Sequence, residues 1–337
     1  MSSRFTLLET DLRTSIARTR WLLTGYMMFG AALGVCIVYG STVGSAVHLW
    51  LHHNTYGYAF AVLPIAAFIV WLRREHFRSS VPQPDFSAVP VVLLFASLWL
   101  TGQKQSVLEI QHIAVPGMLV GIIVSAIGWA NAYRFALPLL YLFLLAPAGT
   151  PLLPYLQVIT TWFATAFLQL GHIPFYAEGN FIEVATGKYE VAPGCAGLNF
   201  VLALATMAPL YCEIMYSKLA KKIVVLACMM MLVPVANGLR VFGIIAIAEY
   251  TNRAIDISAD HLFYGWVFFS SIVLVLFWIG SFVSDPPPAP VPIMPWGGNY
   301  TRAELFADPI IVRVQWVLLF SVCISVMFPL LQAGGVL

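Results

Sequence analysis

The stretch Glu190-Val-Ala-Pro-Gly-Cys-Ala-Gly-Leu-Asn-Phe200 places a thiol in a Pro/Gly turn directly before a long apolar run. The five cysteines match no metal or disulfide spacing. Taken alone, Cys195 is read equally well as a small apolar residue at a helix start, but it is the one cysteine at the edge of a run. The others lie inside apolar runs, where cysteine packs as a small hydrophobic residue: Cys36, Cys212, Cys228 and Cys323.

The composition around this turn is that of a membrane protein. Of the 337 residues, 60% are hydrophobic and 9% are charged, and the mean hydropathy is +0.86. These charges are too few to cover a soluble globule of this size. The net charge of +2 offers no general basic surface, and the chain contains no phosphate-binding Gly loop, dinucleotide fingerprint or nucleic-acid motif. We therefore expect an all-α polytopic membrane protein with no cofactor and no nucleic-acid partner.

The distribution of Lys and Arg sets the predicted topology. Arginines before the first span place the N-terminus in the cytoplasm by the positive-inside rule, and about eight or nine helices then cross the membrane. All of the 17 Lys and Arg except Lys104, Lys188, Arg240 and Arg253 fall on the cytoplasmic side. Several of these predicted spans are shorter than the roughly 20 residues that a crossing helix needs. The apolar runs lie at about 21–42, 59–72, 89–101, 114–132, 135–148, 198–214, 223–235, 262–283 and 316–331.

Three further segments need a separate interpretation. Residues 153–171 are long enough to cross, but polar side chains interrupt them, and we expect a helix at the outer interface. Residues 181–191 alternate around Thr-Gly and predict a β-hairpin before the Cys turn. Residues 241–248 are too short to cross, so residues 251–261 are expected to stay outside. The predicted domains are a membrane domain over 1–283, with its core motifs at 181–270, and a Pro-rich cytoplasmic loop plus one more helix over 284–337.

Cys195, Arg240 and His261 come from three different segments and reach the same outer face in this topology. A helix N-terminus and a nearby guanidinium both favour a thiolate. An arginine is always charged and presents a rigid fork of donors that suits an oxyanion, and a histidine exchanges protons near neutrality. The three residues together therefore indicate thiolate chemistry, although Arg240 is also read as snorkelling to headgroups and His261 as an interfacial anchor.

Other residues are candidates for supporting roles. Asn237 precedes Arg240 by three positions and would share its helix face, while Gly194 and Gly197 would bend the chain and let a substrate backbone approach. The histidines at 48, 52 and 53 have a spacing that could ligate a metal on a helix. Because no carboxylate accompanies them, we interpret them as an interfacial anchor and predict no metal site.

Three short motifs resemble the exosortase/archaeosortase family. They are Val191-Ala-Pro-Gly-Cys-Ala-Gly-Leu198, Asn237-Gly-Leu-Arg-Val241 and His261-Leu-Phe-Tyr-Gly-Trp266, which agree with the family in order, spacing and placement at membrane-helix ends. The similarity covers roughly residues 21–283. Many relatives have a serine and a basic residue where this chain has Ala196 and Asn199.

The resemblance implies a polytopic cysteine transpeptidase of the plasma (inner) membrane, with its active site on the extracytoplasmic side. Its partners would be surface proteins that end in a short recognition motif, a transmembrane helix and a basic cluster. Cys195 would be the nucleophile, Arg240 the oxyanion and thiolate stabiliser, and His261 the acid and base. The supporting positions would be Asn237, Gly194, Gly197, Asn199 and Gly265. A transporter, or an export partner without catalysis, would fit the composition but would leave the three motifs unexplained.

Overall fold

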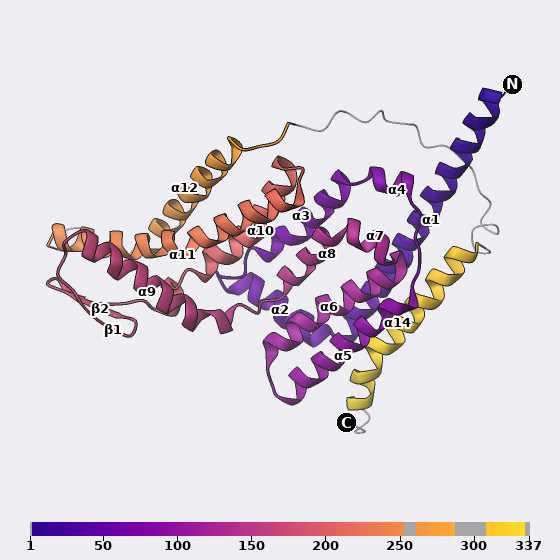
Figure 1. The fold of residues 1–337 in the computed structure, drawn as a ribbon. Helices are drawn as coiled ribbons and strands as arrows, with labels where there is room; N and C mark the ends of the chain where they lie inside the picture. The colour runs from indigo at the N-terminus through magenta and orange to yellow at the C-terminus, as the bar shows by residue number, and fades with distance from the viewer. Residues whose placement is uncertain (1, 253–260, 287–307, 334–337) are drawn as a thin grey trace. The chain divides into compact units, whose positions relative to one another are not determined.

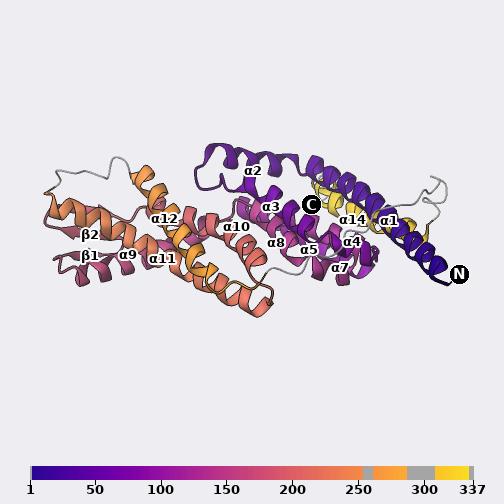
Figure 2. The same cartoon turned by 90° about the horizontal axis from the view of Figure 1, so that it is seen from above.

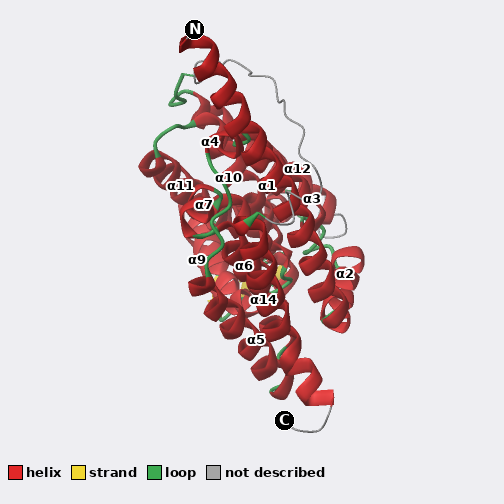
Figure 3. Cartoon of the chain, turned by 90° about the vertical axis from the view of Figure 1, so that its right-hand side faces the viewer, coloured by secondary structure: helices red, strands yellow, loops and turns green. Residues whose placement is uncertain are grey.

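The computed structural model describes residues 2–252, 261–286 and 308–333, and the described chain is mostly helical (Figures 1 and 3). Seven of the described helices are long and apolar enough to cross a membrane, and three shorter apolar helices accompany them. The predicted all-α polytopic architecture is thus confirmed. The chain folds into two compact units, one over residues 1–53, 59–148 and 289–337 and the other over 54–58 and 149–288.

The first unit is organised around α6 (Leu108–Ile127), whose span is 72% buried. It packs against α5 (Val89–Lys104), α1 (Ser2–Val38) and α14 (Pro309–Ala333). The remaining described elements are short: α2 (Gly40–His52), α3 (Ala59–Leu72), α4 (Glu75–Ser79), η1 (Phe86–Ala88), α7 (Trp129–Arg134), α8 (Ala136–Tyr141) and η2 (Leu142–Leu145).

Both ends of this unit depart in detail from the predicted spans. The first helix begins well before residue 21, breaks at Tyr39 and continues as α2 to His52. The predicted C-terminal helix is present as α14 but begins earlier, because the Asp308 carboxylate accepts a hydrogen bond of 2.9 Å from the Ile310 amide and caps its start. The same carboxylate pairs with Arg20 at 2.7 Å. Most of the predicted Pro-rich loop lies outside the described residues.

The second unit contains a helical frame and a small sheet. Its elements are η3 (Thr150–Leu152), α9 (Leu153–Leu170), β1 (Tyr176–Glu178), β2 (Phe181–Val184), β3 (Gly187–Glu190), η4 (Pro193–Cys195), α10 (Leu198–Met215), α11 (Leu219–Tyr250) and α12 (His261–Ser281). The sheet is antiparallel in the order β1-β2-β3, and Val184 pairs with Gly187 across the tight turn. The hairpin predicted over 181–191 is confirmed, with β1 as an additional strand.

The helix α11 corrects the prediction that residues 241–248 form a separate short piece. It runs without interruption over 32 residues, about 48 Å at 1.5 Å per residue, which is longer than the ~30 Å hydrocarbon core of a bilayer. Gly238 does not end it, although glycine destabilises a helix interior. A Cβ at Gly238 would lie 2.3 Å from Cβ of Phe163, so this glycine lets α9 approach α11 closely.

The helix predicted at the outer interface is α9, and the structure places it alongside the C-terminal half of α11 (Figure 2). Contacts step along both helices in the same direction, from Thr160 with Asn237 to Phe167 with Phe242. By length and composition the segment Thr150–Leu170 is also able to cross a membrane. Beyond these contacts, the two helices and the sheet share an apolar core that includes Leu168, Ile182 and Ile245.

The opposite end of α11 is held by polar contacts with α10 and α12. The Lys222 ammonium pairs with Glu213 at 2.6 Å and the Lys221 ammonium with Asp285 at 2.5 Å. Asp285 also accepts hydrogen bonds of 2.8 Å from the amide and hydroxyl of Ser217. Lys221 and Ser217 together hold the pKa of the Asp285 carboxyl well below its usual range. These contacts tie the start of α11 to the end of α12.

Candidate active site

Cys195 ends the short 3-10 turn η4, and α10 starts three residues later. The Cys195 amide donates a hydrogen bond of 2.8 Å to the Ala192 carbonyl, which closes the turn. Gly197 then takes a left-handed conformation with φ of +86° and forms the N-cap of α10. The thiol therefore lies next to the unpaired backbone N–H groups of a helix start, an environment that favours an anion, and its side chain is half-buried.

Two helices hold this loop through its carbonyl groups. From α9, the Gln157 amide donates to the Val191 carbonyl at 2.9 Å and the Thr160 hydroxyl donates to the Ala196 carbonyl at 3.2 Å. From α11, the Asn237 amide nitrogen donates to the Cys195 carbonyl and to the Thr160 hydroxyl oxygen, both at 2.9 Å. Each such bond also satisfies a carbonyl that would otherwise be costly to bury.

Asn237 itself is 1% exposed, and its other amide atom, Oδ1, is buried without a partner among the described residues. Asn237, which the sequence predicts as a supporting residue, therefore holds the backbone of Cys195 through its carbonyl group. Gly197 is required by the same contact, because a Cβ there would lie 2.7 Å from Cγ of Asn237. The group that lies close to Gly197 is thus the Asn237 side chain. From the sequence we expect a substrate backbone at this position instead.

Gly194 differs from Gly197. A Cβ at Gly194 would meet no heavy atom within 4 Å, so the space beside the thiol is open on that side. Asn199 lies in the first turn of α10, is partly exposed and makes no hydrogen bond to any described residue. Among the described residues, no side-chain hydrogen bond ties it to the loop.

Arg240 lies one turn after Asn237 on the same face of α11, as the spacing predicts, and its residue is 4% exposed. Its guanidinium lies near the side chains of Cys195 and Tyr264, close enough to interact electrostatically with both. Its Cζ lies 5.3 Å from the centre of the Phe200 ring. Within the described chain no carboxylate pairs with it, and its Nε has no partner. A cation buried this way is costly unless an anion accompanies it.

The helix α12 reaches the same place. A Cβ at Gly265 would lie 3.2 Å from Nη1 of Arg240 and 3.6 Å from the Phe200 ring, so Gly265 lets α12 lie against the guanidinium. His261 begins α12, one helical turn before Gly265. The backbone of His261 therefore lies one turn from the residue of α12 that contacts Arg240.

Sequence reasoning did not single out several residues of this site. Gln157 and Thr160 are polar residues in an apolar segment, and Phe200 and Tyr264 stand within quoted motifs without a predicted role. The available signal was the spacing of Gln157, Thr160, Thr161 and Ala164, which places polar and small residues along one stripe of α9. A stripe of this kind indicates a helix face that contacts polar backbone.

Residues 50–278, more than half of the chain and all three motifs, match the family model described as transmembrane exosortase. The chain belongs to the transmembrane exosortase family. No curated protein and no solved structure matches it. The matched range of this exosortase ends before the Pro-rich segment and α14, so the C-terminal extension is outside the family match. The chain is thus a multi-pass membrane protein and a membrane exosortase.

Proposed function

We propose that this exosortase is a cysteine protease or transpeptidase of the plasma (inner) membrane. It would cleave the C-terminal sorting signal of surface-destined proteins on the extracytoplasmic side. The observation that carries the proposal is the position of a buried Arg240 guanidinium near the Cys195 side chain, with no carboxylate partner among the described residues. Ionisation of that thiol would supply the anion that the buried cation needs.

The reaction follows from these groups. The Cys195 thiolate attacks the carbonyl carbon of the scissile peptide bond, and a tetrahedral intermediate forms with its negative charge on oxygen. The Arg240 guanidinium and the N–H groups at the start of α10 stabilise that charge. The C–N bond then breaks, His261 protonates the leaving amine, and an acyl group remains on Cys195 as a thioester. An amine or water completes the cycle by attacking the thioester while His261 takes a proton from it, which releases the thiolate and restores the protonated His261.

A processing assay tests this proposal. The substrate is a co-encoded protein that ends in a short motif, an apolar helix and an Arg/Lys cluster, expressed together with the exosortase. We expect uncleaved substrate to accumulate with Cys195→Ala, Arg240→Ala and His261→Ala, each in a protein that still enters the membrane. Cys228→Ala is the matched control, because Cys228 is an exposed thiol on the same helix as Arg240. Normal processing by Cys195→Ala would rule the proposal out.

A further inference from the structure

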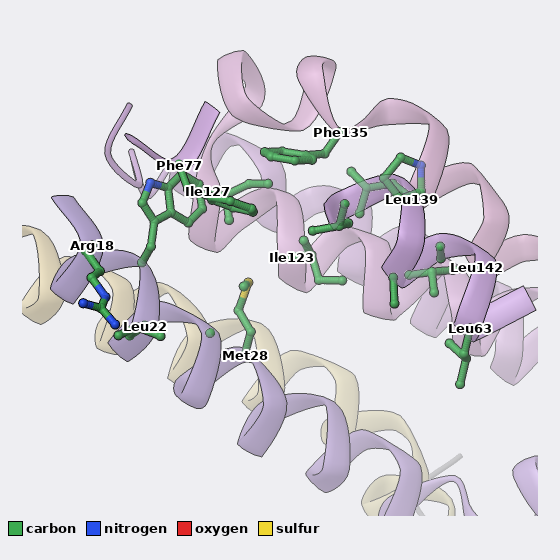
Figure 4. A pocket seen from close by; sticks show the side chains of 16 residues that line it. Arg18, Leu22, Met28, Leu63, Phe77, Ile123, Ile127, Phe135, Leu139 and Leu142 are labelled. Carbon is green, nitrogen blue, oxygen red and sulfur yellow. The ribbon is translucent and has the colours of Figure 1, made fainter. Parts of the chain in front are cut away.

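A large apolar cavity lies in the first unit, between α1, α3, α6 and α8, and its volume is about 630 Å³. Figure 4 shows side chains of α1, among them Leu22 and Met28, facing Ile127 and Leu139 across this space. The volume falls within the ~300–1,000 Å³ typical of sites that hold a small molecule. Nearly all of the lining is aliphatic or aromatic, and the exception is Arg18.

The cavity is elongated. Its lining on α1 runs from Arg18 to Met28, a rise of about 15 Å along a helix. That is close to half of the ~30 Å hydrocarbon core of a bilayer. The cavity therefore has about the length of one leaflet, and it starts at Arg18, the charged residue of its described lining.

That end of the unit carries an excess of cations. The Arg73 guanidinium donates to the Arg134 carbonyl, and Arg134 directly precedes Phe135, which lines the cavity. The His76 ring meets the Phe135 ring edge-on at 6.2 Å. Burial, and then the charges of Arg134 and Arg73, lower the pKa of His76, so both guanidinium groups lie close to this ring.

The nearby carboxylates do not offset this charge. Asp308 pairs with Arg20 at 2.7 Å, and Asp85 accepts a hydrogen bond of 2.8 Å from the Ser87 amide at the start of η1. Glu75, at the start of α4, is a further acidic residue near this end. Against it stand the arginines at 18, 73, 74 and 134.

From this arrangement we propose that the cavity binds one acyl chain of an anionic phospholipid, with the lipid phosphate at the Arg18 rim. Apolar space between helices that opens at a basic end is the combination that recognises an anionic headgroup and its chain. The alternative occupant, a partner helix that ends in Lys and Arg, would place its cations next to the arginines at this end and would be repelled. The site is separate from Cys195 and does not depend on the proposed peptidase activity.

Native mass spectrometry of the full-length protein tests the apolar part of the site, with dioleoyl phosphatidylglycerol and dioleoyl phosphatidylcholine supplied in equal amounts. We expect the wild type to retain phosphatidylglycerol preferentially. Gly25→Phe should abolish this adduct, because Gly25 lines the cavity and a Cβ there meets no atom within 4 Å. Gly30→Phe is the matched control on α1, since Gly30 also has open space but does not line the cavity, and it should retain the lipid.

The charged part is tested by Arg18→Gln, an exposed position on α1 where the substitution leaves the core intact. We expect the preference for phosphatidylglycerol to fall about fivefold, since each Lys or Arg near an anionic surface contributes on the order of 1 kcal/mol. Lys104→Gln, at the other end of the unit, should leave the preference unchanged. Equal retention of the two lipids by the wild type, or cross-linking of a photoreactive side chain at position 25 to a protein helix, would overturn the proposal.

Discussion

At the scale of single residues, the loop that carries Cys195 depends on one buried amide. Asn237 joins the Cys195 carbonyl to the Thr160 hydroxyl, so it acts on the thiol through the backbone and is a positioning residue. Removal of such a buried hydrogen-bond donor leaves its acceptors unsatisfied, which costs about 1–3 kcal/mol. The geometry of the nucleophile and the stability of the second unit should therefore change together.

We predict that Asn237→Ala lowers the midpoint of thermal unfolding in detergent and reduces processing of the substrate more than the loss of folded protein accounts for. Asn131→Ala is the matched control, because Asn131 is also buried and its amide also donates to two carbonyl groups, those of Val81 and Ile127. That control should lower stability to a similar extent while the folded fraction keeps its processing rate. Equal processing by the two folded variants would show that Asn237 is only structural.

Substitution by alanine should change the stability of the protein at Gly197 but not at Gly194. Gly197→Ala places a Cβ on a left-handed residue and 2.7 Å from Asn237. We therefore expect a loss of about 1–3 kcal/mol of stability from the backbone strain alone, together with loss of processing. Gly194→Ala meets no atom within 4 Å and should fold like the wild type. Comparable unfolding temperatures for the two variants would contradict this difference.

At the scale of elements, the second unit depends on the contact between α9 and α11. Small residues at helix interfaces let backbones approach closely, and Gly238 is such a residue against Phe163. We predict that Gly238→Ala separates the two helices, lowers the unfolding temperature and weakens processing, because Thr160 and Asn237 lie on the two helices that would separate. Gly34→Ala on α1, where a Cβ meets nothing within 4 Å, is the control. An unchanged unfolding temperature for Gly238→Ala would count against this packing.

The contacts of Asp285 predict an acid-sensitive step at the start of α11. Its folded pKa is depressed by Lys221 and Ser217, so its contribution to stability is present above the unfolded pKa of about 3.9 and is lost as the pH falls below that value toward the folded pKa. Asp285→Asn should therefore lower the unfolding temperature at pH 7 and show a smaller further decrease below pH 4. Glu178→Gln, on the exposed strand β1, should keep the wild-type pH profile.

The sequence predicted the elements that local interactions determine, but not those that depend on packing between distant segments. Charge and hydropathy predicted the polytopic architecture, and alternation around Thr186-Gly187 predicted the hairpin, because both signals are local. The continuity of α11 through Gly238 could not be predicted, since it rests on packing against Phe163 from a distant segment. The supports of the Cys195 loop were missed for the same reason: Gln157 and Thr160 act through backbone carbonyls far along the chain.

For the whole molecule, an active site on the extracytoplasmic side requires that the two ends of α11 lie on opposite sides of the membrane. Thr186, in the β2–β3 turn, donates to Glu249 near one end of the helix, and Ser217 precedes the other end. In a variant without other cysteines, a membrane-impermeant maleimide applied to intact cells should label Asn180→Cys, beside the sheet. It should label Ser217→Cys only after permeabilisation. The reverse pattern would place the Cys195 loop in the cytoplasm.

Cys195 is proposed to carry the acyl intermediate, and intact-protein mass spectrometry detects such an intermediate. The full-length protein would be incubated with a peptide that contains the sorting motif and quenched in acid before the thioester is released. The account predicts a mass increase equal to the N-terminal part of the peptide, located on Cys195 by fragmentation, removed by hydroxylamine and abolished by Cys195→Ala but not by Cys228→Ala. Turnover of the peptide without any adduct on Cys195 in the wild type, or with the adduct on another residue, would contradict it.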